Sequence, residues 1–207
     1  ALIDAIIAAF PKAGPANPTG PSPIFICGMF RSGSTLLEQV LAAHSRVTAG
    51  GELDFVPALA RTEFAPFPQA MSRLTEQRTG ELAAQYRTHL ARLYPCAELV
   101  TDKRPDNFLF VGLIKRLFPN AKIISTTRNV LDNCLSVFFL HLDHMMNYAF
   151  DVEHISHYYM QQQRLMKHWN VLYGADIHEF DYDAFVREPR ATLEPVLRFL
   201  GLEWEEQ

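Results

Sequence analysis

The chain has 207 residues, of which 48% are hydrophobic and 20% charged, and its formal net charge is −4. This length can bury the core of one domain, and the slightly acidic balance argues against a general basic surface for nucleic acid, although local Arg and Lys clusters can still bind a small anion. The three cysteines lie far apart and show no CxxC or Cys/His spacing, so we expect neither a disulfide framework nor a metal site.

The chain contains no apolar run near the ~20 residues of a membrane span. Its first residues, ALIDAIIAAF, lack the basic flank of a signal peptide. We therefore expect a cytoplasmic protein without a membrane span. Because the chain begins with Ala rather than Met, we also expect it to be a fragment of a longer protein.

The predicted elements alternate between helices and strands. A first helix precedes the proline-rich segment 11–23, so we divide the chain into an N-terminal helix and connector (1–21) and a main domain (22–207). Strands are predicted at 23–28, 99–101, 122–127 and 176–180, helices at 34–44, 79–93, 106–118, 130–142, 151–172 and 192–200, and irregular structure at 57–68. This alternation predicts an α/β fold of three layers, P-loop-like, with a central parallel sheet.

The segment GMFRSGST (28–35) lies between a predicted strand and a predicted helix, where backbone N–H groups and the helix dipole favour an anion. Its spacing is that of a P-loop, G-x-x-x-x-G-K-[ST], but Ser34 replaces the lysine that a nucleotide triphosphatase needs on its phosphates. The cation lies inside the loop instead, at Arg31, whose guanidinium can bind a phosphate or a sulfonate with two hydrogen bonds. The alternative interpretation is an ordinary Gly/Ser turn before a helix.

The stretch PIFICGMFRSGSTLLEQVLAAH (23–44) resembles the 5′-phosphosulfate loop, P-[RK]-S-G-T-T-L, of sulfotransferases that use 3′-phosphoadenosine 5′-phosphosulfate (PAPS). Phe30 replaces the usual proline, and a serine replaces the first threonine. A transferred sulfuryl group carries less charge than a phosphoryl group, so we expect no metal ion. The resemblance implies that the 5′-phosphosulfate is bound by Arg31, Ser32, Gly33, Ser34 and Thr35.

A second anion site is predicted at Arg128, which follows the strand run KIISTT at the edge where parallel sheets bind ligands. Ser136 lies about two helical turns later and has to face back toward that edge to share an anion with Arg128. Alone, such an arginine is usually a surface or capping charge, but the pair resembles the family's 3′-phosphate motif, R-x7-S. Leu140 stands where the family often has a further basic residue. Tyr182 resembles the nucleotide-contacting tyrosine of the family, and a tyrosine that anchors a helix start is the alternative.

Sulfuryl transfer needs a base for the proton of the acceptor hydroxyl and cations near the bridging oxygen. Glu52 is the candidate base: it follows two glycines, and by resemblance it lies as far after Arg31 as the catalytic glutamate of tyrosylprotein sulfotransferases. Lys103 resembles the lysine of the family's K-D-P segment, although Arg104 replaces the aspartate. The alternatives are a solvated surface glutamate and a loop charge, and Asp54 is the reserve candidate for the base.

The resemblance covers about 22–203 and is closest to bacterial sulfotransferases with a tyrosylprotein-sulfotransferase-like catalytic domain, which often follow tetratricopeptide repeats. It implies transfer of a sulfuryl group from PAPS to an acceptor hydroxyl, with 3′,5′-ADP as the product. The implied catalytic residues are Glu52, Lys103 and Arg31. Because the chain ends before the family's last PAPS contacts, we expect a C-terminal segment to be missing.

The acceptor stays open among protein tyrosine, carbohydrate, lipid and small metabolite. Tyrosylprotein enzymes hold acidic residues around the target tyrosine with arginines, and Asp54 and Ala58 occupy those places here. Two other functions stay open as well. A P-loop nucleotide kinase is disfavoured by the missing lysine and by the lack of an obvious Walker-B strand, whereas a non-catalytic nucleotide-binding or scaffold domain would bind nucleotide without transfer.

Overall fold

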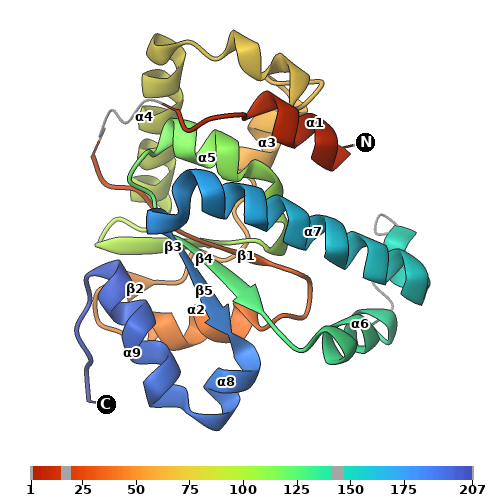
Figure 1. Ribbon diagram of the computed structural model, residues 1–207. Coiled ribbons are helices and arrows are strands. Elements are labelled where there is room, and N and C mark those ends of the chain that lie inside the picture. The colour runs from red at the N-terminus through yellow and green to blue at the C-terminus, as the bar shows by residue number, and fades with distance from the viewer. Residues whose placement is uncertain (1, 15–19, 141–146, 207) are drawn as a thin grey trace.

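A five-stranded parallel sheet lies between two layers of helices in the computed structural model, which describes residues 2–14, 20–140 and 147–206 (Figure 1). The strand order is β2-β3-β1-β4-β5, and every pairing between neighbours is parallel. The strands are β1 (Ile24–Gly28), β2 (Val47–Thr48), β3 (Leu99–Lys103), β4 (Ile123–Thr127) and β5 (Ile177–Asp181). The predicted three-layer α/β fold with a central parallel sheet is therefore confirmed.

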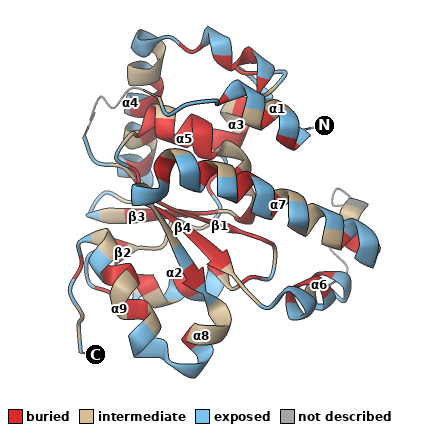
Figure 2. Cartoon of the chain, viewed as in Figure 1, coloured by how far each residue is buried: buried red, intermediate tan, exposed pale blue. Residues whose placement is uncertain are grey.

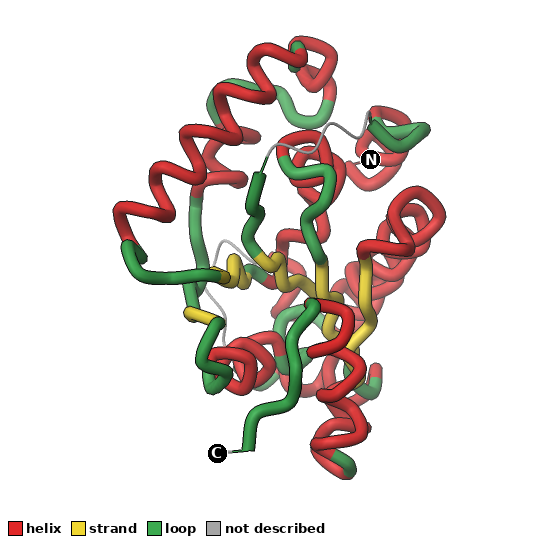
Figure 3. The backbone as a smooth tube through the Cα atoms, turned by 90° about the vertical axis from the view of Figure 1, so that its left-hand side faces the viewer, coloured by secondary structure: helices red, strands yellow, loops and turns green. Residues whose placement is uncertain are grey.

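Helices cover both faces of the sheet (Figure 3). One layer contains α1 (Leu2–Ala9), α3 (Phe55–Arg61), α4 (Glu76–Leu93), α5 (Val111–Leu117) and α7 (Val152–Tyr173), and the other contains α2 (Ser34–Ala42), α8 (Tyr182–Arg187) and α9 (Pro189–Leu200). Helix α6 (Val130–Phe138) extends beyond the sheet and packs against α7. Short 3₁₀ turns are η1 (Gln69–Arg73), η2 (Pro105–Phe110), η3 (Asn147–Phe150) and η4 (Gly174–Asp176).

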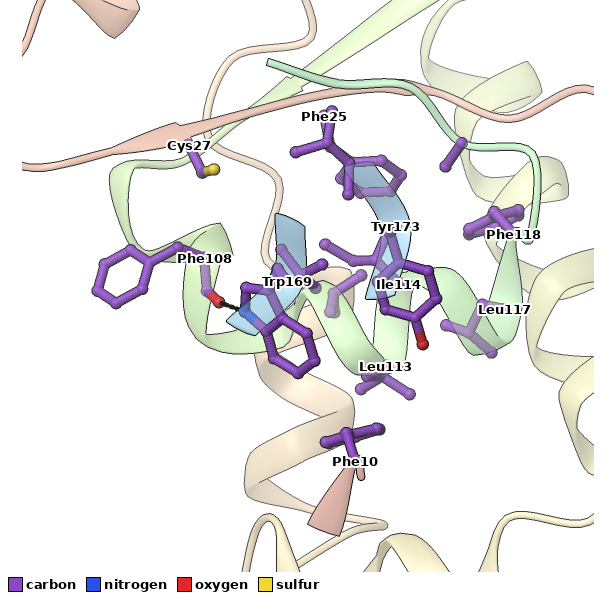
Figure 4. Packing of buried hydrophobic residues seen from close by; sticks show 14 of the residues in the cluster. Phe10, Phe25, Cys27, Phe108, Leu113, Ile114, Leu117, Phe118, Trp169 and Tyr173 are labelled. Carbon is purple, nitrogen blue, oxygen red and sulfur yellow. Dashed lines mark hydrogen bonds between the residues drawn. The ribbon is translucent and has the colours of Figure 1, made fainter. Parts of the chain in front are cut away.

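Two hydrophobic clusters hold the layers to the sheet, and buried residues concentrate on the strands and the inner helix faces (Figure 2). In the larger cluster the fully buried Trp169 donates its indole N–H to the carbonyl oxygen of Phe108 at 2.8 Å (Figure 4). Phe10, just after α1, packs edge-on against Trp169 with ring centroids 5.6 Å apart. The first helix therefore shares its core with the sheet layer.

Most predicted elements lie within a few residues of the observed ones, and the differences have local causes. The prediction of irregular structure at 57–68 is wrong in its first part, because α3 occupies Phe55–Arg61 and its Pro57 lies in the first helical turn, where no N–H is needed. The two-residue β2 is too short for a periodic pattern, and α8 was not predicted. Helix α6 ends at Phe138, earlier than predicted, and residues 141–142 of that prediction lie outside the described residues. Within the described part of the chain, no helix has the length and hydrophobicity to cross a membrane.

A buried acid lies between the sheet and the α4 layer. Asp102 on β3 is fully buried, and its carboxylate accepts hydrogen bonds from the Tyr86 hydroxyl and, at 3.1 Å, from the Asn107 amide. Burial raises the pKa of Asp102 to about 7, and the two hydrogen bonds only partly oppose this effect. The carboxyl group therefore holds its proton in the folded protein at pH values where it is ionised in the unfolded chain.

This raised pKa predicts how stability depends on pH. Asp102 contributes full stability below the unfolded pKa of 3.8, and the contribution is lost as the pH rises toward the folded value of about 7. Between pH 5 and pH 7, wild type is expected to lose about 2 kcal/mol more unfolding free energy than Asp102→Asn. Urea unfolding of both proteins at the two pH values measures the difference, and parallel pH dependence would contradict the buried, protonated carboxyl.

Candidate functional site

Each strand of the sheet leads, at its carboxyl end, into a predicted site residue. The loop 29–33 follows β1, Glu52 comes after β2, Lys103 ends β3, Arg128 follows β4, and Tyr182 follows β5. Between these ends lies a cleft of about 310 Å³. Its lining includes seven predicted residues: Arg31, Gly33, Ser34, Thr35, Glu52, Arg128 and Tyr182. The parallel sheet thus gathers residues that are far apart in the sequence.

The loop after β1 delivers the N-terminus of α2 to this cleft. Gly33 caps the helix with φ 95°, a conformation that favours glycine, and a Cβ there would lie 2.4 Å from Cδ2 of Tyr182. The glycine therefore lets the loop pack directly on the tyrosine ring. Ser34 and Thr35 form the first turn of α2, where backbone N–H groups without helical partners and the helix dipole favour an anion.

Arg31 adopts a left-handed conformation with φ 69°, which costs a residue with a side chain about 1 kcal/mol or more. Two contacts across the cleft hold it. Its carbonyl oxygen accepts a hydrogen bond from Nη1 of Arg128 at 3.3 Å, and its own Nε donates to Oγ of Ser136 at 3.1 Å. Helix α6 thus turns the hydroxyl of Ser136 toward Arg31, although Ser136 is not among the described residues that line the cleft.

Arg128 contacts Tyr182 and the Arg31 loop, but not every N–H group of its guanidinium is used in these contacts. Its guanidinium lies over the ring of Tyr182, 4.9 Å from the centroid, as in a cation–π contact. Among the described residues, Nε of Arg128 is buried and has no hydrogen-bond partner. Unpaired buried N–H groups are uncommon in proteins, so Nε of Arg128 stands out among the donors around the cleft.

Ser32 differs from the other predicted loop residues because it does not line the cleft, and its side chain is buried inside the protein. Its hydroxyl donates to the carbonyl oxygen of Met29 and lies 2.6 Å from the hydroxyl of Thr126 on β4. These contacts tie the loop to the sheet. Binding of a ligand by Ser32 stays a prediction, and the observed contacts give its hydroxyl a role in shaping the loop.

Glu52 and Lys103 form an ion pair at the edge of the cleft, with 2.8 Å between Oε1 and Nζ. The lysine side chain is 7% exposed and the glutamate side chain 50%, so a nearly buried cation fixes a carboxylate that a ligand can reach. The reserve candidate, Asp54, is directed elsewhere: it pairs with Arg61 at 2.6 Å and with Arg104 at 3.8 Å. Of the two acids, only Glu52 lines the cleft.

Two supporting residues were missed by sequence reasoning. The buried Asn133 of α6 donates from its amide to the carbonyl oxygen of Phe30 at 2.8 Å and so connects α6 to the loop. Glu38 is buried in α2 and contacts the segment before Glu52. A signal for Glu38 was present, because it lies in the apolar stripe formed with Leu37 and Leu41.

Comparisons with known proteins identify the family of the chain. Residues 23–206 match the model of the sulfotransferase family. An uncharacterized protein of Aquifex aeolicus is 36% identical over 198 residues, which make up 89% of this chain and 26% of that protein. The chain therefore spans about a quarter of the length of this relative.

Solved structures share the fold. The sulfotransferase domain of the curacin biosynthetic pathway aligns with a TM-score of 0.68 and 19% identity, covering 90% of this chain and 76% of the other. A mouse sulfotransferase solved in complex with PAP, which is 3′,5′-ADP, aligns with a TM-score of 0.54 and 11% identity, covering 98% of this chain and 65% of the other. The match of the family model over nearly the whole chain, on a fold that these structures share, shows that the chain belongs to the sulfotransferase family.

Proposed function

We propose that this chain moves a sulfuryl group from PAPS to the hydroxyl of an acceptor and releases 3′,5′-ADP. The observation that carries the proposal is the Glu52–Lys103 ion pair, which lies at the cleft that also contains Arg31 and Arg128. A carboxylate base beside several cations is the arrangement that sulfuryl transfer needs. The mouse sulfotransferase of the same fold that was solved with PAP supports this choice of nucleotide.

The cleft residues fit the two anionic ends of such a nucleotide. Arg31 and the first turn of α2 would bind the 5′-phosphosulfate, since they combine a guanidinium with free backbone N–H groups. Arg128 and Ser136 would bind the 3′-phosphate, because the guanidinium of Arg128 lines the cleft and can pair with a phosphate through charge-assisted hydrogen bonds. Tyr182 would contact the nucleotide from beneath Arg128.

When bound, PAPS supplies the sulfuryl group and a phosphate as its leaving group. Glu52 takes the proton of the acceptor hydroxyl while the acceptor oxygen forms its bond to sulfur and the bond from sulfur to the bridging oxygen breaks. The ammonium of Lys103 has three N–H donors, of which Glu52 uses one, so others can stabilise the charge on that bridging oxygen. Once Glu52 has taken the proton it is neutral, so the ammonium of Lys103 can interact fully with the charge on the bridging oxygen. Arg31 adds a positive charge beside the sulfuryl group that is transferred.

The acceptor is proposed as a hydroxyl group, and a protein tyrosine is the first class to test because of the sequence resemblance. By the resemblance, Asp54 stands where tyrosylprotein enzymes have an arginine that holds acidic residues of the acceptor. Two arginines are nevertheless near this position, because Asp54 forms ion pairs with Arg61 and Arg104. A panel of tyrosine peptides, carbohydrates and small phenols with radiolabelled PAPS compares the classes. Binding of 3′,5′-ADP without transfer to any of them would favour the non-catalytic domain.

Binding of 3′,5′-ADP is expected to depend on the second anion site. Arg128→Ala removes a charged hydrogen-bond partner of a phosphate, so affinity measured by calorimetry should fall about 10–150-fold. The exposed Arg92 in the last turn of α4 is the matched control, and Arg92→Ala should bind as wild type does. Unchanged affinity of a folded Arg128→Ala protein, or tighter binding of ATP with Mg²⁺ than of 3′,5′-ADP, would contradict this account.

Removing the proton affinity of Glu52 is expected to slow the chemical step. Glu52→Gln keeps the shape of the side chain, so kcat should fall about 10²–10⁴-fold while 3′,5′-ADP affinity stays within a few-fold of wild type. Steady-state kinetics with radiolabelled PAPS, together with calorimetry, measure both quantities. Asp54→Asn is the control and should retain turnover, and the reverse result would transfer the role of base to Asp54.

A further inference from the structure

The segment that carries Glu52 has no regular secondary structure, yet it is tightly anchored on β3. Gly50 lies so close to the strand that a Cβ would be 2.1 Å from the carbonyl oxygen of Thr101. The carbonyl oxygen of Gly51 accepts a hydrogen bond from the backbone N–H of Lys103 at 2.9 Å. The backbone before the base is therefore attached to the same strand that carries its ion-pair partner.

A buried carboxylate completes this attachment. Oε1 of Glu38 accepts a hydrogen bond from the backbone N–H of Gly51 at 3.0 Å and another from the hydroxyl of Thr101 at 2.6 Å. The oxygen of that hydroxyl in turn accepts from the N–H of Gly50 at 3.1 Å. Two successive N–H groups directly before Glu52 are thus held by one linked pair of side chains.

A glutamate at position 38 lowers the stability of the fold relative to an apolar residue. Glu38 is only 3% exposed, and among the described residues no lysine or arginine forms an ion pair with it. Burying a polar carboxyl group costs stability, and an apolar side chain would suit the stripe between Leu37 and Leu41 better. What Glu38 adds is an acceptor at the depth of α2 that reaches the backbone of Gly51.

We infer that Glu38 is a positioning residue: it fixes the Gly50–Gly51 backbone so that the carboxylate of Glu52 meets Lys103 and the acceptor hydroxyl in the reactive geometry. This inference rests on the proposed role of Glu52 as the base. Helix α2 then contributes to two parts of the site. Its first turn forms part of the proposed 5′-phosphosulfate site, and its second turn, through Glu38, holds the backbone that precedes the base.

Substitutions of Glu38 separate this role from a general structural one. Glu38→Leu removes the acceptor, and kcat is expected to fall about 10–100-fold, since a displacement of about 1 Å in a reacting group can cost that much. The KM for PAPS and the affinity for 3′,5′-ADP should stay within about three-fold. Glu38→Gln keeps an oxygen for both hydrogen bonds and should restore kcat to within about three-fold of wild type. A uniform loss of kcat and nucleotide affinity in Glu38→Leu would overturn the inference.

A double-mutant cycle tests whether Glu38 acts through the base. In the Glu52→Gln background, Glu38→Leu should have no further effect on kcat, because the group that it positions has already lost its function. A full additional loss would overturn the inference. Thr101→Val, which removes the linking hydroxyl at similar volume, provides a second variant in case Glu38→Leu does not fold.

Hydrogen exchange gives a readout that does not depend on activity. The backbone amides of Gly50 and Gly51 should exchange faster in Glu38→Leu and at the wild-type rate in Glu38→Gln. Unchanged exchange in Glu38→Leu would overturn the positioning role even if wild type transfers sulfuryl groups normally. If wild type does not transfer a sulfuryl group from radiolabelled PAPS to any acceptor, the proposed function is refuted. The exchange rates of Gly50 and Gly51 would then still test whether Glu38 holds this backbone.

Discussion

The common direction of the five strands is the constraint on which the site depends. Because all neighbouring strands pair in parallel, their carboxyl ends meet at one edge of the sheet. The register places Ile26 of β1 level with Lys103 and Gly28 level with Thr126. The loop after β1 therefore lies between the lysine at the end of β3 and the arginine after β4, and no long loop is needed to bring them together.

Alternation along β3 divides its polar residues between two tasks. Thr101 and Lys103 point to the α2 face, where the hydroxyl contacts Glu38 and the ammonium contacts Glu52. Asp102, between them, points to the α4 face and is bonded by Tyr86. One strand thus carries both a member of the ion pair at the cleft and a buried acid in the core, since successive side chains of a strand face opposite sides of the sheet.

Among the described residues, the non-glycine residue with a left-handed backbone is Arg31, in the loop after β1. Arg31 keeps its left-handed conformation because Arg128 donates to its carbonyl oxygen and Ser136 accepts from its side chain. The same loop is tied down from inside by Ser32 and Asn133. Strained residues persist where surrounding contacts over-determine them. Here those contacts come from Arg128, which follows β4, and from Ser136 on α6, the two residues of the second predicted anion site.

What the sequence by itself determined was the fold class, the family and the position of the Arg31 loop between a strand and a helix, because these have local signatures. Apolar runs alternate with helical patterns, and the loop with Arg31 is a continuous motif of which each residue can be read in place. Short or mixed elements could not be predicted in this way: β2 has only two residues, and α3 extends from Phe55 into the proline-containing segment 57–68 that was predicted to be irregular.

Only the tertiary structure decided which side chains meet. Glu52 and Asp54 are two residues apart and chemically similar, yet the first pairs with Lys103 and the second with Arg61. Likewise Ser136 reaches Arg31, although its motif pairs it with Arg128. Such choices depend on strand register, on the direction of each side chain and on burial, which arise from packing between distant segments and leave no periodic trace in the sequence.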